Sequence, residues 1–176
     1  VCSYKYGTNG WLGLTIVGVI GTQITQATVM LNDTYFSTKT YNTSAWRNYV
    51  MCHELGHTFG LDHRDEIFDN PNLGTCLDYT DDPSGNLKKQ ASNQFPDLHD
   101  YEQLELIYNS TPIVASSSVM AQLSGNARFK DSDEIDSENP STWGKVIKKD
   151  RKGRNSVYGK ELRNGQKVYT HVLWAD

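Results

Sequence analysis

The run from His53 to His63, which reads H-E-x-x-H-x-x-G-x-x-H, constrains this chain more than any other feature. Residues four apart share one face of a helix, so His53 and His57 can direct both imidazoles at one metal ion. Gly60 can adopt a positive φ and end the helix, so that the chain brings His63 back to the same metal. The full pattern arises by chance in about one of 100,000 sequences of this composition. It therefore predicts a three-histidine metal site.

Three histidine ligands favour zinc of the catalytic kind, because three nitrogens leave the fourth position of a tetrahedral ion open. Water can bind in that position, where zinc lowers its pKa to about 7 and polarises a carbonyl oxygen. Glu54 follows the first ligand, His53, and can take the proton from the water and pass it to a leaving amine. The sequence thus favours a zinc-dependent endopeptidase, a metalloendopeptidase in which Glu54 is the general base and acid.

The extended motif resembles that of the metzincin clan of zinc endopeptidases, whose second mark is a Met-turn beneath the zinc ligands. Cys76-Leu77-Asp78-Tyr79 resembles this turn, with Leu77 in place of Met. Leu is similar in volume and apolarity, so the exchange should cost less than about 1.5 kcal/mol. The resemblance implies that Tyr79 touches the zinc site and donates to the oxyanion; the alternative is an ordinary core or rim tyrosine.

The stretches before the motif are similar to strands of matrixin-like secreted microbial proteases, and the resemblance spans residues 1 to about 109. Leu12 to Ile20 and Ile24 to Leu31 are rich in Ile, Val and Thr, which predicts two paired strands. The implied fold is α+β and zincin-like: a twisted mixed sheet, an active-site helix, a zinc loop, the Met-turn-like turn and a C-terminal helix. In this clan the strand nearest the cleft pairs with substrate, and Thr25 to Leu31 is our candidate.

Two helices can be bounded from their caps. Thr43 or Ser44 can cap the active-site helix, and Gly60 ends it. Asp97 can cap a second helix that carries an apolar stripe to Tyr108 and resembles the metzincin C-terminal helix. His99 lies in that helix, and we expect it to be structural rather than a ligand.

The N-terminus differs from the clan pattern. Metzincin catalytic domains usually carry a first strand and a long helix upstream, but only 52 residues precede His53 here. The chain begins with Val1 and shows no signal peptide. We therefore expect a processed form or a fragment of a secreted, extracellular enzyme, N-terminally shortened.

Three cysteines make an odd count, which in a secreted chain leaves one thiol free or paired outside the segment. Cys52 and Cys76 each precede an element of the zinc site, and these elements must meet in space. They either form a disulfide or remain two buried thiols that act as small apolar residues. Cys2 is left over in either case.

Composition divides the chain into three parts. Residues 1–111 form the expected catalytic domain, and residues 112–142 are a Ser-rich, acidic linker. Residues 143–176 hold nine Lys or Arg against three acids, whereas residues 1–111 hold six against 13. Within the basic segment, Asn164-Gly165 between two strand-like runs predicts a β-hairpin. We treat this segment as an appendage to the catalytic domain.

Charge and hydropathy limit the partners. The basic segment could bind polyanions or grip an acidic face of the protease, but a solvated turn is the simpler interpretation, and no nucleic-acid motif accompanies it. The longest apolar run, Trp11 to Ile20, is about half a transmembrane span. We expect a monomer that acts on a protein or peptide substrate, with no nucleic acid and no membrane span.

Two acidic stretches have weaker interpretations. The loop from Arg64 to Gly74 would help to wall the substrate pocket by resemblance, or is simply solvated. Calcium is a second, weakly supported cofactor, because Asp81, Asp82, Ser84 and Asn86 carry oxygen ligands but lack the order of an EF-hand. A rival to the enzyme is a catalytically inert zinc-binding module of the same fold; retention of Glu54 argues against it. A further rival is a polyanion binder built on the basic segment.

Overall fold

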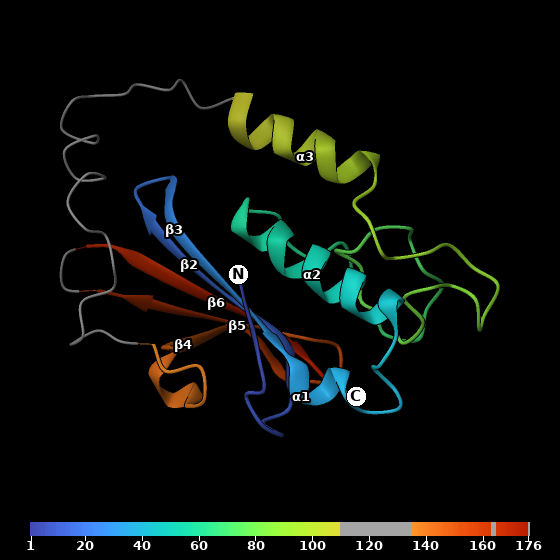
Figure 1. The fold of residues 1–176 in the computed structure, drawn as a ribbon. Helices are drawn as coiled ribbons and strands as arrows, with labels where there is room; N and C mark the ends of the chain where they lie inside the picture. Colours follow the sequence, from blue (N-terminus) through green and yellow to red (C-terminus); the bar gives the residue numbers. More distant parts are fainter. Residues whose placement is uncertain (110–134, 163–164, 176) are drawn as a thin grey trace.

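The computed structural model describes residues 1–109, 135–162 and 165–175, and joins its strands into one six-stranded sheet (Figure 1). The sheet order is β1-β3-β2-β6-β5-β4. Only β1 and β3 are parallel among these neighbours, so the sheet is mixed and the predicted α+β class is confirmed. The strands are β1 (Cys2–Tyr4), β2 (Trp11–Ile20), β3 (Gln23–Asn32), β4 (Lys145–Lys149), β5 (Asn155–Glu161) and β6 (Lys167–Trp174).

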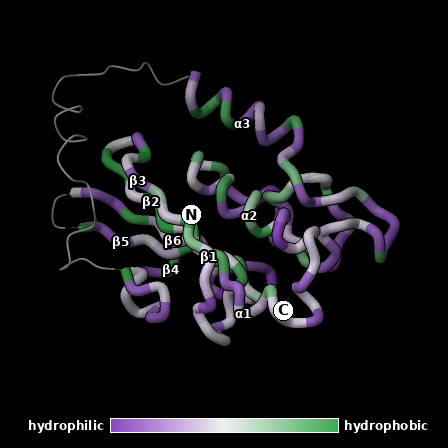
Figure 2. The backbone as a smooth tube through the Cα atoms, in the orientation of Figure 1, coloured by the Kyte–Doolittle hydropathy of each residue, from purple (hydrophilic) through white to green (hydrophobic). Residues whose placement is uncertain are grey.

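The N-terminal hairpin forms as the sequence predicts. Strands β2 and β3 pair antiparallel from Gly13 opposite Leu31 to Ile20 opposite Gln23. Gly21, at φ 61°, turns the chain between them in a conformation that costs a glycine little. Figure 2 shows green hydrophobic stretches along these strands, as expected where both faces of a sheet are covered.

The C-terminal strands are part of the same sheet. Strands β5 and β6 form the predicted antiparallel hairpin, and β6 also pairs with β2 from Trp11 opposite Trp174 to Val19 opposite Lys167. Residues 143–176 are therefore not an appendage with a sheet of their own. The expected linker, residues 112–142, lies outside the described residues as far as position 134.

Strand β6 contributes to a hydrophobic core on each face of the sheet. Leu173 packs with the core beneath the helices, whereas Val168 and Val172 pack with the core on the opposite face. That second core also holds Trp143, whose Nε1 donates a hydrogen bond of 2.6 Å to the carbonyl of Asp136. Removing β6 would therefore open both cores.

The helices lie on one side of the sheet, with α2 (Ser44–Thr58) next to it and α3 (Leu98–Asn109) farther out (Figure 1). Thr43 is the N-cap of α2 and accepts a hydrogen bond from the backbone of Trp46. Gly60, at φ 87°, follows the end of α2, as predicted. Asp97 accepts from the backbone N–H of Asp100 and caps α3. Two short helices complete the described fold, α1 (Asp33–Phe36) and the 3₁₀ turn η2 (Pro140–Thr142).

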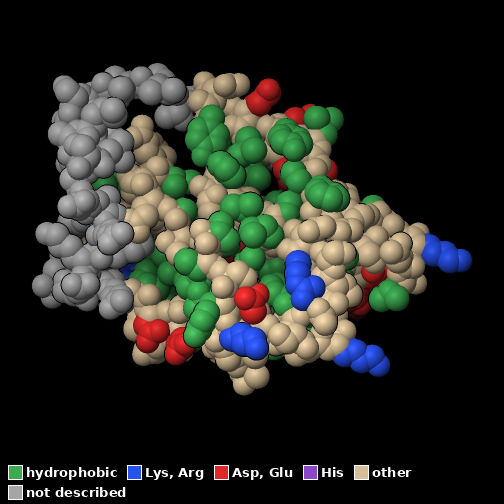
Figure 3. Space-filling view, in the orientation of Figure 1, with side chains coloured by type: hydrophobic (Ala, Val, Ile, Leu, Met, Phe, Trp, Pro, Cys, Tyr) green, Lys and Arg blue, Asp and Glu red, His purple; other side chains and the backbone are tan. Residues whose placement is uncertain are grey.

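The outer surface is apolar in places around α3. Leu98, Leu106 and Tyr108 are exposed, and hydrophobic side chains gather over this region in Figure 3. No histidine side chain is seen on the face drawn in Figure 3. Among the described helices, none has the length and apolarity to span a membrane.

Candidate metal centre

The three histidines of the motif come together at one point beside α2. Among the described residues, His53, His57 and His63 can each offer one ligand atom, and these atoms all lie within 4.8 Å of one another. The two histidines of α2 are one turn apart on one face. Gly60 then redirects the chain, and Nε2 of His63 arrives 3.1 Å from Nε2 of His57. The convergence predicted from the motif is confirmed, and the group could hold a metal ion.

Each ring is oriented by a hydrogen bond at its other nitrogen. Nδ1 of His53 donates to the carbonyl of Cys76 and Nδ1 of His57 to the carbonyl of Leu61, both over 2.8 Å. Nδ1 of His63 lies 2.6 Å from Oε1 of Glu66. Because carbonyl and carboxylate oxygens accept these bonds, the proton is on Nδ1 and the lone pair is on Nε2. This arrangement is common around metal-ligating histidines.

The histidine side chains are shut off from solvent. His53 and His57 are 0% and 1% exposed, and the side chain of His63 is 0% exposed. Burial lowers the pKa of His57 to about 4 and holds the pKa values of His53 and His63 well below the ordinary range. The three rings are therefore neutral near pH 7, which is the form that binds a cation.

Glu54 lies between α2 and strand β2. Thr15 Oγ1 donates to Glu54 Oε2 over 2.5 Å, while Glu54 Oε1 is buried without a partner among the described residues. Gly13 makes room for this carboxyl group, since a Cβ at position 13 would collide with it. Burial raises the pKa of Glu54 to about 8, against the opposite effect of the Thr15 hydrogen bond.

Leu77 supports α2 from the other side. It is 1% exposed, and its Cδ2 would lie 2.9 Å from a Cβ at Gly56, which sits between the two helical histidines. The glycine therefore lets Leu77 approach the helix backbone. A disulfide joins Cys52 to Cys76 and ties this turn to α2, so that of the two alternatives for these cysteines the disulfide is the one formed. Cys2 is free and exposed.

Tyr79 stands beside the histidines. Its ring centroid is 4.7 Å from that of His63 and 5.6 Å from that of His53. Its hydroxyl is buried and has no partner among the described residues, and burial raises its pKa well above the usual value. A zinc-site tyrosine and a core tyrosine would both be buried, so burial excludes only a position on the rim. The unpartnered hydroxyl next to the ligands is what an interaction with a bound group would require.

A fourth histidine, His171, was not anticipated from the sequence. It lies on β6 with its ring stacked on that of His57, at a centroid distance of 4.1 Å and an interplanar angle of 19°. Strand alternation puts His171 on the same face of β6 as Tyr169, but alternation does not predict which helix packs on that face. Only the pairing of β6 with β2, where His171 is opposite Thr15, brings it to the metal centre.

Basic side chains from the C-terminal strands close the rim of the site. Lys148 of β4 places Nζ 3.2 Å from Oδ2 of Asp62 and 3.0 Å from Oε1 of Glu66, on either side of His63 in the sequence. Lys152 lies over the ring of Phe68 at 4.6 Å from its centroid. The basic segment thus forms ion pairs with an acidic loop of the domain, which is one of the interactions considered for it.

The candidate substrate strand is separated from β6 by β2, and its pairing with a substrate stays a prediction. Thr25 to Leu31 belongs to β3, and β2 separates β3 from β6, which carries His171 against His57. The strand that contacts Glu54 is β2, and both of its edges are paired, one with β3 and the other with β6. The pairing of β2 with β6 could not be predicted from the sequence, because β6 begins more than 140 residues after β2 ends.

Other proposed groups are engaged elsewhere. Asp82 accepts hydrogen bonds from Ser84 and from the backbone of Leu87 and Lys88, and Asp81 pairs with Lys88, so these carboxylates hold their own loop. His99 lies within ligand distance of Asp97 and Asp100. The carboxylates of that group accept from backbone N–H groups and from Thr75, which makes it a helix cap.

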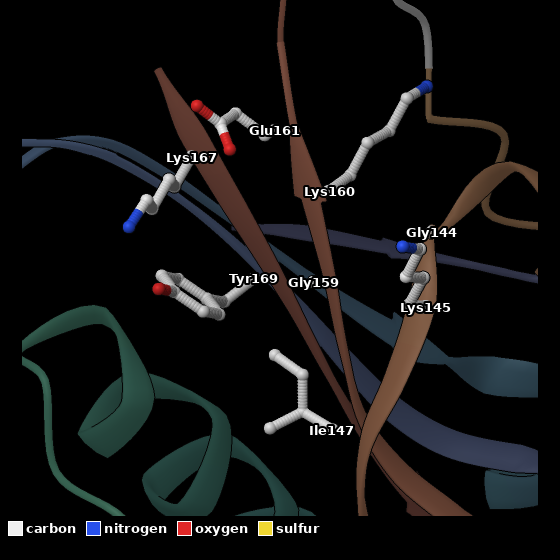
Figure 4. A pocket seen from close by; sticks show the side chains of 8 residues that line it. All are labelled: Gly144, Lys145, Ile147, Gly159, Lys160, Glu161, Lys167 and Tyr169. Atoms are coloured by element: carbon white, nitrogen blue, oxygen red, sulfur yellow. The ribbon is translucent and has the colours of Figure 1, made fainter. Parts of the chain in front are cut away.

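A cavity of about 600 Å³ opens on the C-terminal strands, away from the histidines. Figure 4 shows the side chains of Tyr169, Lys167 and Ile147 around it. Tyr169 precedes His171 by two residues and so shares its face of β6. No residue of the histidine motif lines the cavity, so it is separate from the candidate metal centre.

The donor set fits a metal ion. His53 Nε2, Glu54 Oε1 and Tyr79 Oη are buried atoms without partners in the described residues; His53 belongs to the converging group, Glu54 follows it on α2, and the Tyr79 ring lies beside the His53 ring. Such atoms are rare in proteins unless a missing group satisfies them. Two unprotonated nitrogens 3.1 Å apart likewise repel each other unless a cation lies near both. No family model matches the chain, and searches of curated proteins and of solved structures find no match.

Proposed function

We propose that this protein is a zinc-dependent endopeptidase of metzincin type, with His53, His57 and His63 as the metal ligands. The observation that carries the proposal is the convergence of three Nε2 atoms whose Nδ1 partners are all acceptors. Zinc is favoured because neutral imidazoles in a three-nitrogen set suit it and leave an open position. Its secreted location is part of the proposal and agrees with the disulfide between Cys52 and Cys76.

When bound, zinc supplies a Lewis acid that polarises a substrate carbonyl and makes water more acidic. The protein supplies the proton carrier. Glu54 has a free, buried Oε1, and its pKa of about 8 in the metal-free chain lies near neutral pH, where a general acid–base group works best. Thr15 holds the other carboxyl oxygen and so aims Oε1. Tyr79 supplies a hydroxyl donor for a developing oxyanion.

A second candidate function is a zinc-binding module without catalysis. The observation that favours it is the closure of the site: the ligands are 0–1% exposed, and β6 occupies the edge of β2 that a substrate strand would need. Glu54 favours the enzyme, because a purely structural site has no use for a buried carboxyl with an unpartnered oxygen. Peptidase activity decides between the two.

The test is hydrolysis of a quenched fluorescent peptide library by the purified chain loaded with one zinc. Glu54→Gln should cut the rate by about 10²- to 10⁴-fold, as expected for loss of a general base, and leave the zinc content unchanged. Glu102→Gln is the matched control, because Glu102 is exposed on α3, and it should retain the parental rate.

Two results would contradict the proposal. One is a parent chain that binds one zinc per molecule yet cleaves no peptide, which would establish the inert module. The other is a Glu54→Gln protein with parental activity, which would remove Glu54 from the mechanism. Absence of zinc after purification without chelator would reject both functions.

A further inference from the structure

Besides the rings of His53 and His63, the ring of His57 contacts the carbonyl of Leu61 and the ring of His171. The carbonyl of Leu61 accepts from Nδ1 and sets the direction of that bond. This single hydrogen bond restricts the torsion about Cβ–Cγ but does not fix it, and a small change in that torsion moves Nε2 and tilts the ring plane. The stacked ring of His171, 4.1 Å away and inclined by 19°, opposes that rotation.

His171 is not itself placed as a ligand. Among the described residues, the converging ligand atoms within 4.8 Å belong to His53, His57 and His63, and no such group contains His171. Its ring centroid is 6.4 Å from that of His63. His171 is therefore stacked on one proposed ligand ring, lies edge-on and farther from a second, and does not join the converging ligand atoms.

Nor is His171 part of a cover that can be lifted away. Its strand, β6, is paired with β2 along its length and with β5 from Lys167 to His171, and Val168, Val172 and Leu173 are 0–1% exposed in the two cores. Displacing β6 would break the centre of the sheet. Strand β6 is therefore a permanent wall of the metal centre.

The neighbouring strand supports Glu54 in the same way. Thr15 is directly opposite His171 in the β2–β6 register, and the two side chains share the face that covers α2. Thr15 donates to the Glu54 carboxylate, and His171 stacks on His57. One cross-strand pair thus contacts both the proposed base and a proposed ligand, three residues apart on α2.

We propose that His171 is a positioning residue of the metal centre, which holds the ring plane of His57 through stacking. The inference rests on the metal site of the proposed function, but not on peptidase activity. It also assigns a role to β6: the strand completes the metal centre from more than 100 residues away. A flat ring at position 171 is what the role requires, and its nitrogen atoms are not.

The test measures binding of cobalt(II) and of zinc to full-length variants by competition with a chromogenic chelator. His171→Leu keeps an apolar side chain of similar size but loses the flat ring. It should weaken cobalt binding by about 10- to 100-fold, the usual effect of losing an outer partner of a ligand, and change the visible spectrum of the bound cobalt. His171→Phe keeps a ring and should bind within about threefold of the parent, with the parental spectrum.

Tyr169→Leu is the matched control, since it removes an aromatic ring from the same face of β6 next to the cavity in Figure 4. It should leave cobalt affinity and spectrum unchanged. A folded His171→Leu protein with parental affinity and spectrum would overturn the inference. So would a His171→Phe protein as weak as His171→Leu, because a nitrogen atom would then be required. If His171→Leu does not fold, parental binding by His171→Phe still supports stacking. A parent chain that binds neither metal would instead refute the proposed function.

Discussion

Helix α2 is supported on its two sides in different ways. On one side, Leu77 packs against Gly56, and the Cys52–Cys76 disulfide fastens the turn to the helix. On the other side, strands β2 and β6 present Thr15 and His171, which reach Glu54 and His57. We call these the apolar side and the strand side.

The two sides differ in what they can be expected to control. Leu77, Gly56 and the disulfide do not titrate, but the same turn carries Asp78, whose pKa burial raises to about 6. The strand side contacts Glu54, whose buried Oε1 has no partner among the described residues, and His57. Stability should thus depend on both sides, and the strand side should contribute the larger part of the sensitivity to protons.

Acidification of the metal-free chain should have the largest effect. The lowered pKa values of the buried histidines mean that their stabilising contribution is present above about pH 6.5 and is lost as the pH falls. With a folded pKa of about 4, His57 alone should cost about 2 kcal/mol at pH 5. The other three buried histidines add losses of the same sign. Urea denaturation of chelator-treated protein at pH 7 and pH 5 measures the total.

Glu54 acts in the opposite direction in that experiment. Its folded pKa is raised to about 8, so its contribution is complete below about pH 4.5 and is lost as the pH rises. Acidification from pH 7 to 5 should regain about 2 kcal/mol from this group. Glu54→Gln should therefore lose more stability than the parent over the same interval. Equal changes in stability for the parent and for Glu54→Gln over this interval would show that Glu54 does not supply this opposing contribution.

Leu77→Asp should have the next largest effect, because it puts an unpaired carboxylate where the side chain is 1% exposed. We expect a loss of about 3–5 kcal/mol in the free energy of unfolding, measured with metal bound. Leu77→Met is the matched control and should change it by less than about 1.5 kcal/mol, with zinc content preserved. If Leu77→Asp is as stable as the parent, the apolar side does not support the helix as described.

Lys148→Ala should have the smallest effect. Its amino group lies 3.0–3.2 Å from Asp62 and Glu66 but is partly exposed, and Asp62 is largely exposed. Exposed ion pairs contribute little, so the unfolding free energy should fall by less than about 1 kcal/mol, and less still in high salt. A loss above about 2 kcal/mol would show that Lys148 contributes more to the unfolding free energy than an exposed ion pair does.

Sequence patterns anticipated the groups that act through neighbours in the chain. The helical spacing of His53 and His57, the glycine at position 60 and the cap at Thr43 each follow from local geometry, and the structure has them as expected. The hairpins β2–β3 and β5–β6 likewise follow from short turns between strand-like runs. Local rules are sufficient wherever the interacting residues are close in sequence.

The contribution of β6 could not be predicted in that way. Its pairing with β2 joins residues such as Thr15 and His171, and nothing in either segment specifies the partner. The change of charge sign after residue 142 pointed instead to a separate unit. Composition reports what a surface carries, whereas strand order depends on which buried faces fit together. For the same reason the sequence did not show that β2 lies between the candidate substrate strand and β6.

The Cys52–Cys76 bridge couples the metal centre to the redox state of its surroundings. Cys52 precedes the proposed ligand His53, and the carbonyl of Cys76 accepts from the Nδ1 of that same histidine. The disulfide therefore joins the residue that precedes His53 to the residue whose carbonyl orients the His53 ring. Thermodynamic reciprocity then requires that whatever the bridge adds to metal affinity, the metal adds to the bridge's resistance to reductants. A reductant and a chelator should then reinforce each other, because removing either the bridge or the metal makes the other easier to remove.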